Sequence, residues 1–295
     1  MDLHNCALCP RQCGIDRYNG TGFCGEKAVI RAAKAYLHMW EEPCISGTNG
    51  SGTVFFSGCC LKCRFCQNYK ISCEGHGKEI TVKRLAEIFL ELQEKGAHNI
   101  NLVSPTQFVP QIIEALDLCR GKLNIPIVYN TGGYERVETL KMLEGYVDIY
   151  LPDFKYYDNE IAKKYSSAEN YFEVVTAALK EMRRQVGRYK LDKNGIMQSG
   201  LVIRHLTLPT HRHDSVKVLE WIAENLPKDE ILISLMSQYT PFYRSNEFKE
   251  LSRRISTFEY NYVLDKAQKL GLDGFMQEKS SAKEEYTPNF DFVGI

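Results

Sequence analysis

Short runs rich in β-branched and aromatic residues alternate with longer amphipathic segments from Thr53 onward. This alternation restricts the fold more than any other feature, because repeated βα units bury their apolar faces around a parallel sheet. The runs that we expect to form strands are GTVFFSG, NINLVSP, IPIVYNT, VDIYLPDF, GLVIRHLTL and EILISLMS, with LDGFMQ as a candidate for the last one.

The segments between these runs carry apolar residues at helical spacing, which predicts helices that pack on the sheet. They read VKRLAEIFLELQEKG, PQIIEALDLCRG, RVETLKMLEG, YFEVVTAALKEMRRQVG and DSVKVLEWIAENL. A parallel sheet with this many βα units either stays open as a doubly wound sheet or curls into a barrel. No GxGxxG motif follows the first strand, which disfavours a dinucleotide-binding start.

The charge and the N-terminal sequence restrict the partners and the compartment. The 295 residues include 37 Lys and Arg and 37 Asp and Glu, so no overall field attracts nucleic acid or an anionic membrane, and we expect neither as a partner. The opening MDLHNCALCPRQC lacks the pattern of a secretory signal, and no apolar run reaches the roughly 18 residues that span a bilayer. We therefore expect a cytoplasmic protein, in which the 11 cysteines stay reduced and the clustered ones bind metal.

Composition divides the chain into three zones. Residues 1–50 are rich in Cys and Gly and predict a small cap held together by a metal or an auxiliary cluster, because this zone is too short to bury a core of its own. Within it, AVIRAAKAYLHMWEEPCISG is expected to form a hairpin. Residues 51–280 form the α/β core, and the polar and aromatic residues 281–295 are expected to lie over the body as a tail.

Three cysteines, Cys59, Cys63 and Cys66, lie on the loop that follows the first strand. Sites on parallel sheets are built from such loops, at the carboxyl ends of the strands. Three thiolates can bind three irons of a cubane and leave the fourth iron free for chemistry. A zinc site would need a fourth ligand, which Cys60 or Cys73 would supply.

The N-terminal zone carries a second group of cysteines. These residues provide four thiolates, enough for a closed site that holds either a structural zinc or an auxiliary cubane. Their spacing does not distinguish the two metals. The four are Cys6, Cys9, Cys13 and Cys24.

The loop CCLKCRFCQN resembles the CxxxCxxC motif of the radical S-adenosylmethionine (SAM) superfamily, with Phe65 at the aromatic position. Asn68 lies in the polar pair that glycyl-radical activating enzymes carry there. Together with further motifs, the loop is similar to the pyruvate formate-lyase activating enzyme-like, or PflX-like, family over nearly the whole chain. Those motifs are CALCPRQCG, GTGFCG, EEPCISGTNGSGTVFFSGC, PIVYNTGGYE and YLPDFKYYD.

The resemblance implies a partial (β/α)6 barrel with a [4Fe-4S] cluster at its mouth and SAM bound to the open iron. Electron transfer into the sulfonium then yields methionine and a 5′-deoxyadenosyl radical. This radical would abstract hydrogen from a glycine of a partner enzyme, from another protein or from a small molecule. An electron donor such as flavodoxin or ferredoxin is implied as well.

The resemblance also assigns SAM contacts to particular residues. Asp153 and Lys155 match an Asp-x-Lys after the fourth strand that faces SAM and the radical, so they are the candidate catalytic residues, with Lys155 neutralising the methionine carboxylate. Superfamily members usually carry a Gly-Gly-Glu-type segment after the second strand, which binds the methionine amino group. This chain has Ser104 and Thr106 there, so backbone carbonyls or the Thr106 hydroxyl would accept the hydrogen bonds of the methionine amino group.

Further cofactor-binding candidates end the later strands. Arg204 and His205 match an Arg-rich segment of the fifth strand, and since neighbouring strand residues face opposite ways, only one faces the interior; we favour Arg204. Asn130 precedes a Gly-Gly pair that permits close backbone approach to a ligand. Met236 and Gln238 close the sixth strand and are expected to line the adenosine or substrate pocket.

Two other functions stay open at this stage. In a zinc-binding structural or interaction protein, both cysteine groups would be structural, and a fourth ligand would be found near Cys66. In a maturase, a second cluster would bind the substrate directly, and one N-terminal cysteine would be dispensable.

Overall fold

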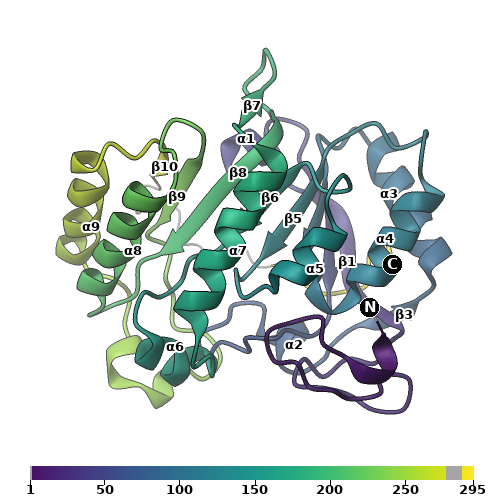
Figure 1. The fold of residues 1–295 in the computed structure, drawn as a ribbon, viewed down its shortest axis with the longest axis horizontal. Helices are drawn as coiled ribbons and strands as arrows, with labels where there is room; N and C mark the ends of the chain where they lie inside the picture. Colours follow the sequence, from purple (N-terminus) through teal and green to yellow (C-terminus); the bar gives the residue numbers. More distant parts are fainter. Residues whose placement is uncertain (1, 277–287) are drawn as a thin grey trace.

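A computed structural model describes residues 2–276 and 288–295 of the chain. The residues expected to complete the core, 277–280, and the first part of the expected tail, 281–287, lie outside the described residues. One sheet runs through the molecule, with helices packed around its outer face (Figure 1).

Seven parallel strands form the body of this sheet, in the order β10-β9-β8-β6-β5-β4-β2. In chain order they are β2 (Ser51–Phe56), β4 (Ile100–Val103), β5 (Ile127–Thr131), β6 (Ile149–Pro152), β8 (Met197–Leu206), β9 (Leu232–Met236) and β10 (Gly274–Met276). Beyond β2 the antiparallel strands β1 (Ile30–His38) and β3 (Lys78–Ile80) extend the sheet, and β7 (Lys190–Leu191) pairs with β8. The predicted α/β fold of the partial-barrel type is confirmed.

The amphipathic segments form helices where the sequence predicts them. The longer helices are α3 (Val82–Glu94), α4 (Val109–Leu118), α5 (Val137–Met142), α6 (Asn159–Ser166), α7 (Tyr171–Val186), α8 (Arg212–Asn225) and α9 (Thr257–Lys269). Short turns are α1 (Pro43–Ser46), α2 (Tyr69–Ser72) and the 3₁₀ helices η1 (Leu3–Asn5), η2 (Thr106–Phe108), η3 (Ser245–Glu247) and η4 (Lys249–Leu251). A capping box between Ser256 and Glu259 begins α9, which satisfies donors that a helix start leaves free.

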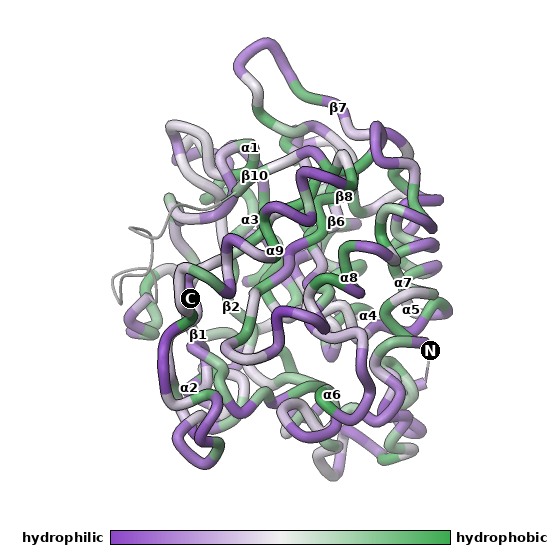
Figure 2. The backbone as a smooth tube through the Cα atoms, turned by 90° about the vertical axis from the view of Figure 1, so that its left-hand side faces the viewer, coloured by the Kyte–Doolittle hydropathy of each residue, from purple (hydrophilic) through white to green (hydrophobic). Residues whose placement is uncertain are grey.

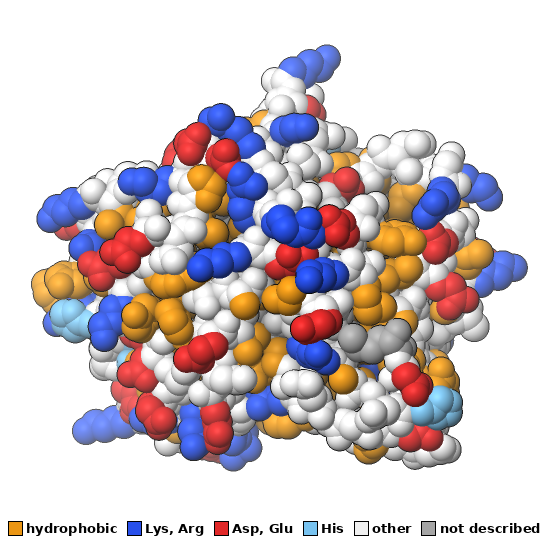
Figure 3. Space-filling model, viewed as in Figure 1, with side chains coloured by type: hydrophobic (Ala, Val, Ile, Leu, Met, Phe, Trp, Pro, Cys, Tyr) orange, Lys and Arg blue, Asp and Glu red, His pale blue; other side chains and the backbone are white. Residues whose placement is uncertain are grey.

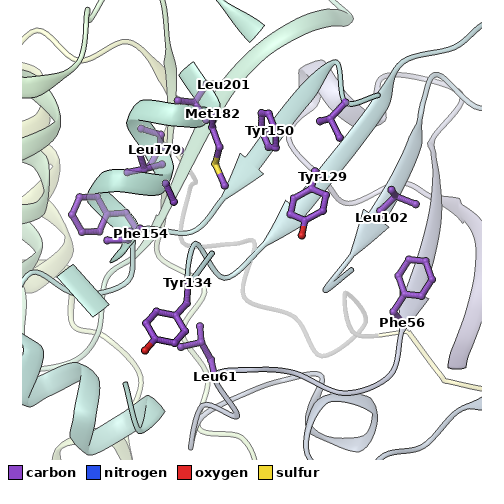
Figure 4. Close-up of a cluster of buried hydrophobic side chains, with 14 of the residues drawn as sticks. Phe56, Leu61, Leu102, Tyr129, Tyr134, Tyr150, Phe154, Leu179, Met182 and Leu201 are labelled. Atoms are coloured by element: carbon purple, nitrogen blue, oxygen red, sulfur yellow. The ribbon is translucent and has the colours of Figure 1, made fainter. Parts of the chain in front are cut away.

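The outer face of the sheet packs on the helices and forms the main core. Tyr150 and Leu201 lie on their strands beside Leu179 and Met182 of α7, and Tyr129 packs edge-on against Tyr150 (Figure 4). All five are buried. This layer fixes the positions of the strands, because a packed interior leaves little room for sliding.

The inner face of the sheet is apolar at the amino-terminal side of the strands and polar at their carboxyl ends. At the amino-terminal side, Val128, Ile149 and Val202 form a small apolar cluster that Cys44 and Ile45 of α1 close. Two residues further on, the same strand faces present Asn130 and Arg204, since side chains on one face recur with a period of two. The polar end of this interior lies at the carboxyl ends of the strands, the same end of the molecule as α2 and the N-terminal segment (Figure 1).

The hairpin expected within residues 28–47 does not form. Residues 30–38 instead make the single strand β1, which pairs antiparallel with β2, so that Tyr36 lies opposite Thr53. The main sheet therefore crosses the boundary expected at residue 50. Only the residues before β1 form a separate small cluster, built on Leu3, Cys6, Leu8 and Ala28.

The described tail, residues 288–295, lies along β1. The amide of Ala35 donates to the carbonyl of Val293 at 2.8 Å, and the amide of Phe292 donates to Ala33 at 3.0 Å. Phe290 packs edge-on against Phe55. The tail thus covers the outer edge of β1 and reaches the end of the barrel interior.

The surface is mixed in charge. On the face viewed in Figure 3, Lys and Arg side chains lie beside Asp and Glu side chains, in keeping with equal totals of 37. The turn that follows β7 projects from the body and is largely hydrophilic (Figure 2). Among the helices of the described residues, none combines the length and the apolar character that crossing a membrane requires.

Candidate active site at the carboxyl ends of the strands

A cavity of about 230 Å³ opens at the carboxyl ends of the parallel strands. It brings together most residues singled out in the sequence, although they come from six separate segments. Those that line it are Cys59, Cys63, Cys66, Phe65, Asn68, Ser104, Asn130, Asp153, Lys155, Arg204, Met236 and Gln238.

The loop with the three cysteines leaves β2 through Gly58. This residue has a φ of +80°, and a side chain there would collide with Glu26 and would lie 2.8 Å from the carbonyl oxygen of Cys24. Only glycine takes this conformation without strain or collision. The loop then passes Leu61, which packs beside Tyr134 at the foot of the sheet (Figure 4). Its path is therefore fixed from both sides.

Each of the three thiols has a hydrogen-bonding neighbour. The Leu61 amide donates to Sγ of Cys59 at 3.3 Å, and the Ser166 hydroxyl donates to Sγ of Cys63 at 3.0 Å. Sγ of Cys66 lies 3.2 Å from the Ser72 hydroxyl. Such contacts orient the sulfurs and stabilise thiolates.

The cysteines differ in their acidity. Hydrogen bonding from the Cys60 thiol lowers the pKa of Cys59 to about 6, whereas burial raises the pKa of Cys63 to about 11 and that of Cys66 further. A bound metal removes this burial penalty, because it deprotonates a coordinating thiol outright. Cys59 is therefore the thiol that most readily supplies a thiolate before metal binds.

These side chains fit a four-iron cluster. Three thiols on one loop open into a cavity that also holds polar side chains for a second ligand. Within the described part of the chain, no three His, Cys, Asp or Glu side chains converge closely enough to hold one metal ion. A cubane does not require such convergence, because each thiolate binds a different iron.

Asp153, Lys155 and Arg204 form a largely buried ion-pair network in the cavity. Lys155 Nζ lies 2.5 Å from Oδ2 of Asp153, and Arg204 Nε lies 2.8 Å from Oδ1. Burial alone would raise the pKa of Asp153, but the two cations hold it below its usual value. The pKa of Lys155 is raised: burial acts against its charge, and Asp153 outweighs that effect. Both groups therefore stay charged at neutral pH.

Sequence reasoning missed Glu41, which completes this network. Its carboxylate accepts from Asn101 at 3.1 Å, from Asn130 at 3.2 Å and from Arg204 at 3.3 Å. Burial raises the pKa of Glu41, opposed by Arg204. The available signal in the sequence was a pair of adjacent acids, Glu41 and Glu42, just after a β-branched and aromatic run. In the structure Glu42 is buried and Glu41 is largely buried.

Arg204 and His205 face opposite sides of β8, as expected. Arg204 faces the cavity and donates to Oδ1 of Asn130 at 2.6 Å. His205 lies buried on the outer face, with Nδ1 2.6 Å from the carbonyl of Phe154, and burial lowers its pKa to about 4. A neutral imidazole in the core is the result.

Thr106 does not reach the cavity. It lies in η2, and its hydroxyl donates to Oε1 of Glu135 at 2.6 Å, away from the three cysteines. Ser104 does line the cavity, with a φ of +55°, and its carbonyl accepts from Gln107 at 2.8 Å. The backbone around Ser104 is therefore what the turn after β4 presents to the cavity.

The four N-terminal cysteines line a second, small cavity. Cys60 lines it too and hydrogen-bonds to Cys9, which lowers the pKa of Cys9 to about 7. Burial raises the pKa of Cys24 to about 11. The cysteines that line this cavity are Cys6, Cys9, Cys13, Cys24 and Cys60.

Comparison with known proteins assigns the class. Residues 53–192 match the family model of the radical SAM superfamily. The uncharacterized protein MJ0674 of Methanocaldococcus jannaschii is 32% identical over 279 residues, covering 91% of this chain and 76% of that protein. This chain belongs to one family with that archaeal protein, and its residues 53–192 form a radical SAM domain. Such a domain indicates an enzyme that uses a [4Fe-4S] cluster and SAM.

Solved structures share the fold. A radical SAM methyltransferase from Sphaerobacter thermophilus aligns with a TM-score of 0.53 at 15% identity, over 77% of this chain and 66% of that one. Streptococcus suis SuiB bound to the precursor peptide SuiA aligns with a TM-score of 0.50 at 14% identity, over 75% of this chain. This chain spans 46% of the length of SuiB, so the likeness concerns less than half of that protein.

Proposed function

We propose that this protein abstracts a hydrogen atom from a protein substrate, of the kind a glycyl-radical activating enzyme acts on, or from a small molecule. When bound, the cluster and SAM supply a 5′-deoxyadenosyl radical by one-electron cleavage of a carbon–sulfur bond. One observation carries the proposal: Cys59, Cys63 and Cys66 open into the same cavity as a buried, charged Lys155.

In this proposal the charged network binds and orients SAM. Lys155 presents an ammonium to the methionine carboxylate, and Asp153 fixes that ammonium at 2.5 Å. Asp153 in turn is held by Arg204 from the neighbouring strand β8. Such a chain of charges positions a ligand without rearrangement, which is how preorganised electrostatic sites act.

Residues at the ends of the outer strands enclose the rest of the ligand. Met236 and Gln238 follow β9, and Phe65 packs against Tyr239, so one wall of the cavity is apolar and aromatic. Exclusion of water from this space would protect a reactive radical from side reactions. Asn130 and Asn68 also line the cavity and supply hydrogen-bonding groups.

The proposal includes a reducing, cytoplasmic setting and a low-potential electron donor such as flavodoxin or ferredoxin. Thiolate ligands must stay reduced to bind iron, and reducing compartments keep them so. The glycyl-radical role is supported by the resemblance of CCLKCRFCQN and LPDFK to activating enzymes.

The test is anaerobic reconstitution with iron and sulfide, followed by dithionite, SAM and an assay for 5′-deoxyadenosine. We expect the product from the wild type and none from the Cys59, Cys63 and Cys66 to Ala triple variant. Cys119→Ser is the matched control, because Cys119 is buried in the core away from both cysteine groups. A loaded, reduced wild type that forms no 5′-deoxyadenosine with any substrate candidate, or zinc in place of iron at the loop, would contradict the proposal.

A further inference from the structure

The second cavity is separate from the catalytic one. The two cavities share no lining residue. However, Cys60 of the second cavity directly follows Cys59 of the 230 Å³ catalytic cavity along the chain.

The space between the thiols indicates the kind of metal group. Zinc binds cysteine sulfur at about 2.3 Å, so four sulfurs around zinc leave no room for a water molecule between them. Here the four thiols line one cavity, yet within the described part of the chain no three His, Cys, Asp or Glu side chains converge closely enough to hold one metal ion. The thiols stand apart around a shared space, as ligands that bind four different irons must.

We infer that Cys6, Cys9, Cys13 and Cys24 hold a second four-iron cluster, and that Cys60 provides the path by which it passes electrons to the catalytic cluster. This inference rests on the proposed function, because it supplies the electron that the proposed reaction consumes.

Several contacts fix the two sites to each other. Cys60 lines the second cavity together with Cys9, and along the chain it directly follows Cys59 of the catalytic cavity. Arg11, within the N-terminal cysteine motif, donates from Nε to the carbonyl of Cys60 at 2.9 Å. It also donates to the carbonyl of Ser166, whose hydroxyl contacts Cys63. The N-terminal loop is thus bound directly to the catalytic loop, and the separation of the two sites cannot vary freely.

The exposure of the thiols gives the path a direction. Cys13 is exposed, whereas Cys6 and Cys24 are buried, and the partly buried Cys9 lines the cavity together with Cys60. One electron enters from a reduced donor of the flavodoxin or ferredoxin class on the Cys13 side, reduces the second cluster and moves on to the catalytic cluster. The second cluster returns to its oxidised state, and no bond is formed or broken.

Metal counting and electron paramagnetic resonance (EPR) test the second site. After anaerobic reconstitution we expect about eight irons per chain in the wild type and about four in the Cys59, Cys63 and Cys66 to Ala variant. A Cys9→Ala, Cys13→Ala double variant should also hold about four irons, now at the catalytic loop. Fully reduced wild type should show EPR signals broadened by interaction between two nearby clusters, and either variant should lose the broadening.

Cys60→Ala tests the path. Cys60 is not proposed as a ligand, so this variant should keep the iron content and the magnetic interaction of the wild type. Reduction of the catalytic cluster by reduced ferredoxin, followed by rapid-freeze EPR, should be slower than in the wild type and in the Cys119→Ser control. An unchanged rate would overturn the path through Cys60.

Failure of this inference is distinguishable from failure of the proposed function. About four irons and one tightly bound zinc per chain, with 5′-deoxyadenosine still formed, would overturn the second cluster alone. Two clusters whose EPR signals simply add would overturn the coupling. Loss of 5′-deoxyadenosine from fully loaded protein would instead count against the proposed function.

Discussion

Arg204 on β8 donates from Nε to Oδ1 of Asp153, which follows β6, at 2.8 Å, and the same guanidinium reaches Glu41 at 3.3 Å. One cation therefore compensates two buried acids that come from different parts of the chain. Lys155 forms an ion pair with Asp153. The polar interior of the barrel depends on Arg204 for its charge balance.

Replacing Arg204 with Met should lower the free energy of unfolding by about 3 kcal/mol, because it leaves Glu41 buried without a cation. The free energy of unfolding of Arg204→Lys should lie between those of the wild type and Arg204→Met. Lysine keeps the positive charge but lacks the planar guanidinium that bonds two acids at once. Urea denaturation under anaerobic conditions measures both. Arg120→Met, which removes an exposed ion pair with Asp117, should cost less than about 1 kcal/mol. If Arg204→Met lowered the free energy of unfolding no more than Arg120→Met does, the ion-pair network would not stabilise the fold.

Glu135 should make stability depend on pH. Burial raises its pKa from 4.5 to about 7, although hydroxyls of Thr106 and Thr131 donate to the carboxylate. The folded state therefore favours the protonated form, and this contribution is full below pH 4.5 and is lost as the pH rises through 7. Relative to Glu135→Gln, the wild type should lose on the order of 3 kcal/mol between pH 4 and pH 9.

The measurement is the difference in free energy of unfolding between the two proteins at several pH values. Glu94→Gln, at an exposed position of α3, controls for the substitution itself. If the difference between wild type and Glu135→Gln does not change with pH, the carboxyl group does not titrate in the folded protein near pH 7.

The strands and helices could be predicted because each follows a local period. The runs ending in VSP, YNT and LPDF become β4, β5 and β6, and the residues after them meet at one edge of the sheet. In a parallel sheet, residues that follow different strands therefore lie close together and can form one site. The cysteine loop, Lys155 and Arg204 were accessible to sequence reasoning for this reason.

Features that depend on distant partners could not be predicted in the same way. Glu41 is buried because Arg204, 163 residues away in the chain, faces it. Thr106 follows a strand as a ligand-binding residue would, but η2 turns its hydroxyl toward Glu135. Residues 30–38 alternate like half of a hairpin, yet their partner is β2, beyond the next loop. In each case the local sequence is compatible with both outcomes, and tertiary contacts decide.

Ser166→Ala should lower the reduction potential of the catalytic cluster. The hydroxyl donates to Sγ of Cys63 at 3.0 Å, and hydrogen bonds to cysteine sulfur are among the factors that set cluster potentials. Loss of the donor disfavours the extra negative charge of the reduced state, so the midpoint moves to a more negative value. A redox titration followed by EPR measures the shift. Ser46→Ala removes a buried hydroxyl bonded to the His38 carbonyl and should leave the midpoint unchanged; an equal shift there would make the effect nonspecific.

Lys155 and Thr106 should differ sharply in their effect on SAM binding, because Lys155 Nζ lies in the cavity and the Thr106 hydroxyl is committed to Glu135. Lys155→Met removes a charged hydrogen bond of about 1.5–3 kcal/mol, so the Kd for SAM should rise about tenfold to a hundredfold. Thr106→Val should change the Kd less than about twofold, while lowering stability by the loss of one buried donor, about 1–3 kcal/mol. Equilibrium binding of SAM to the reconstituted, oxidised protein measures both constants without turnover. If Thr106→Val weakened binding as much as Lys155→Met, the turn after β4 would contact SAM through that hydroxyl, and the placement of η2 would have to change when the ligand binds.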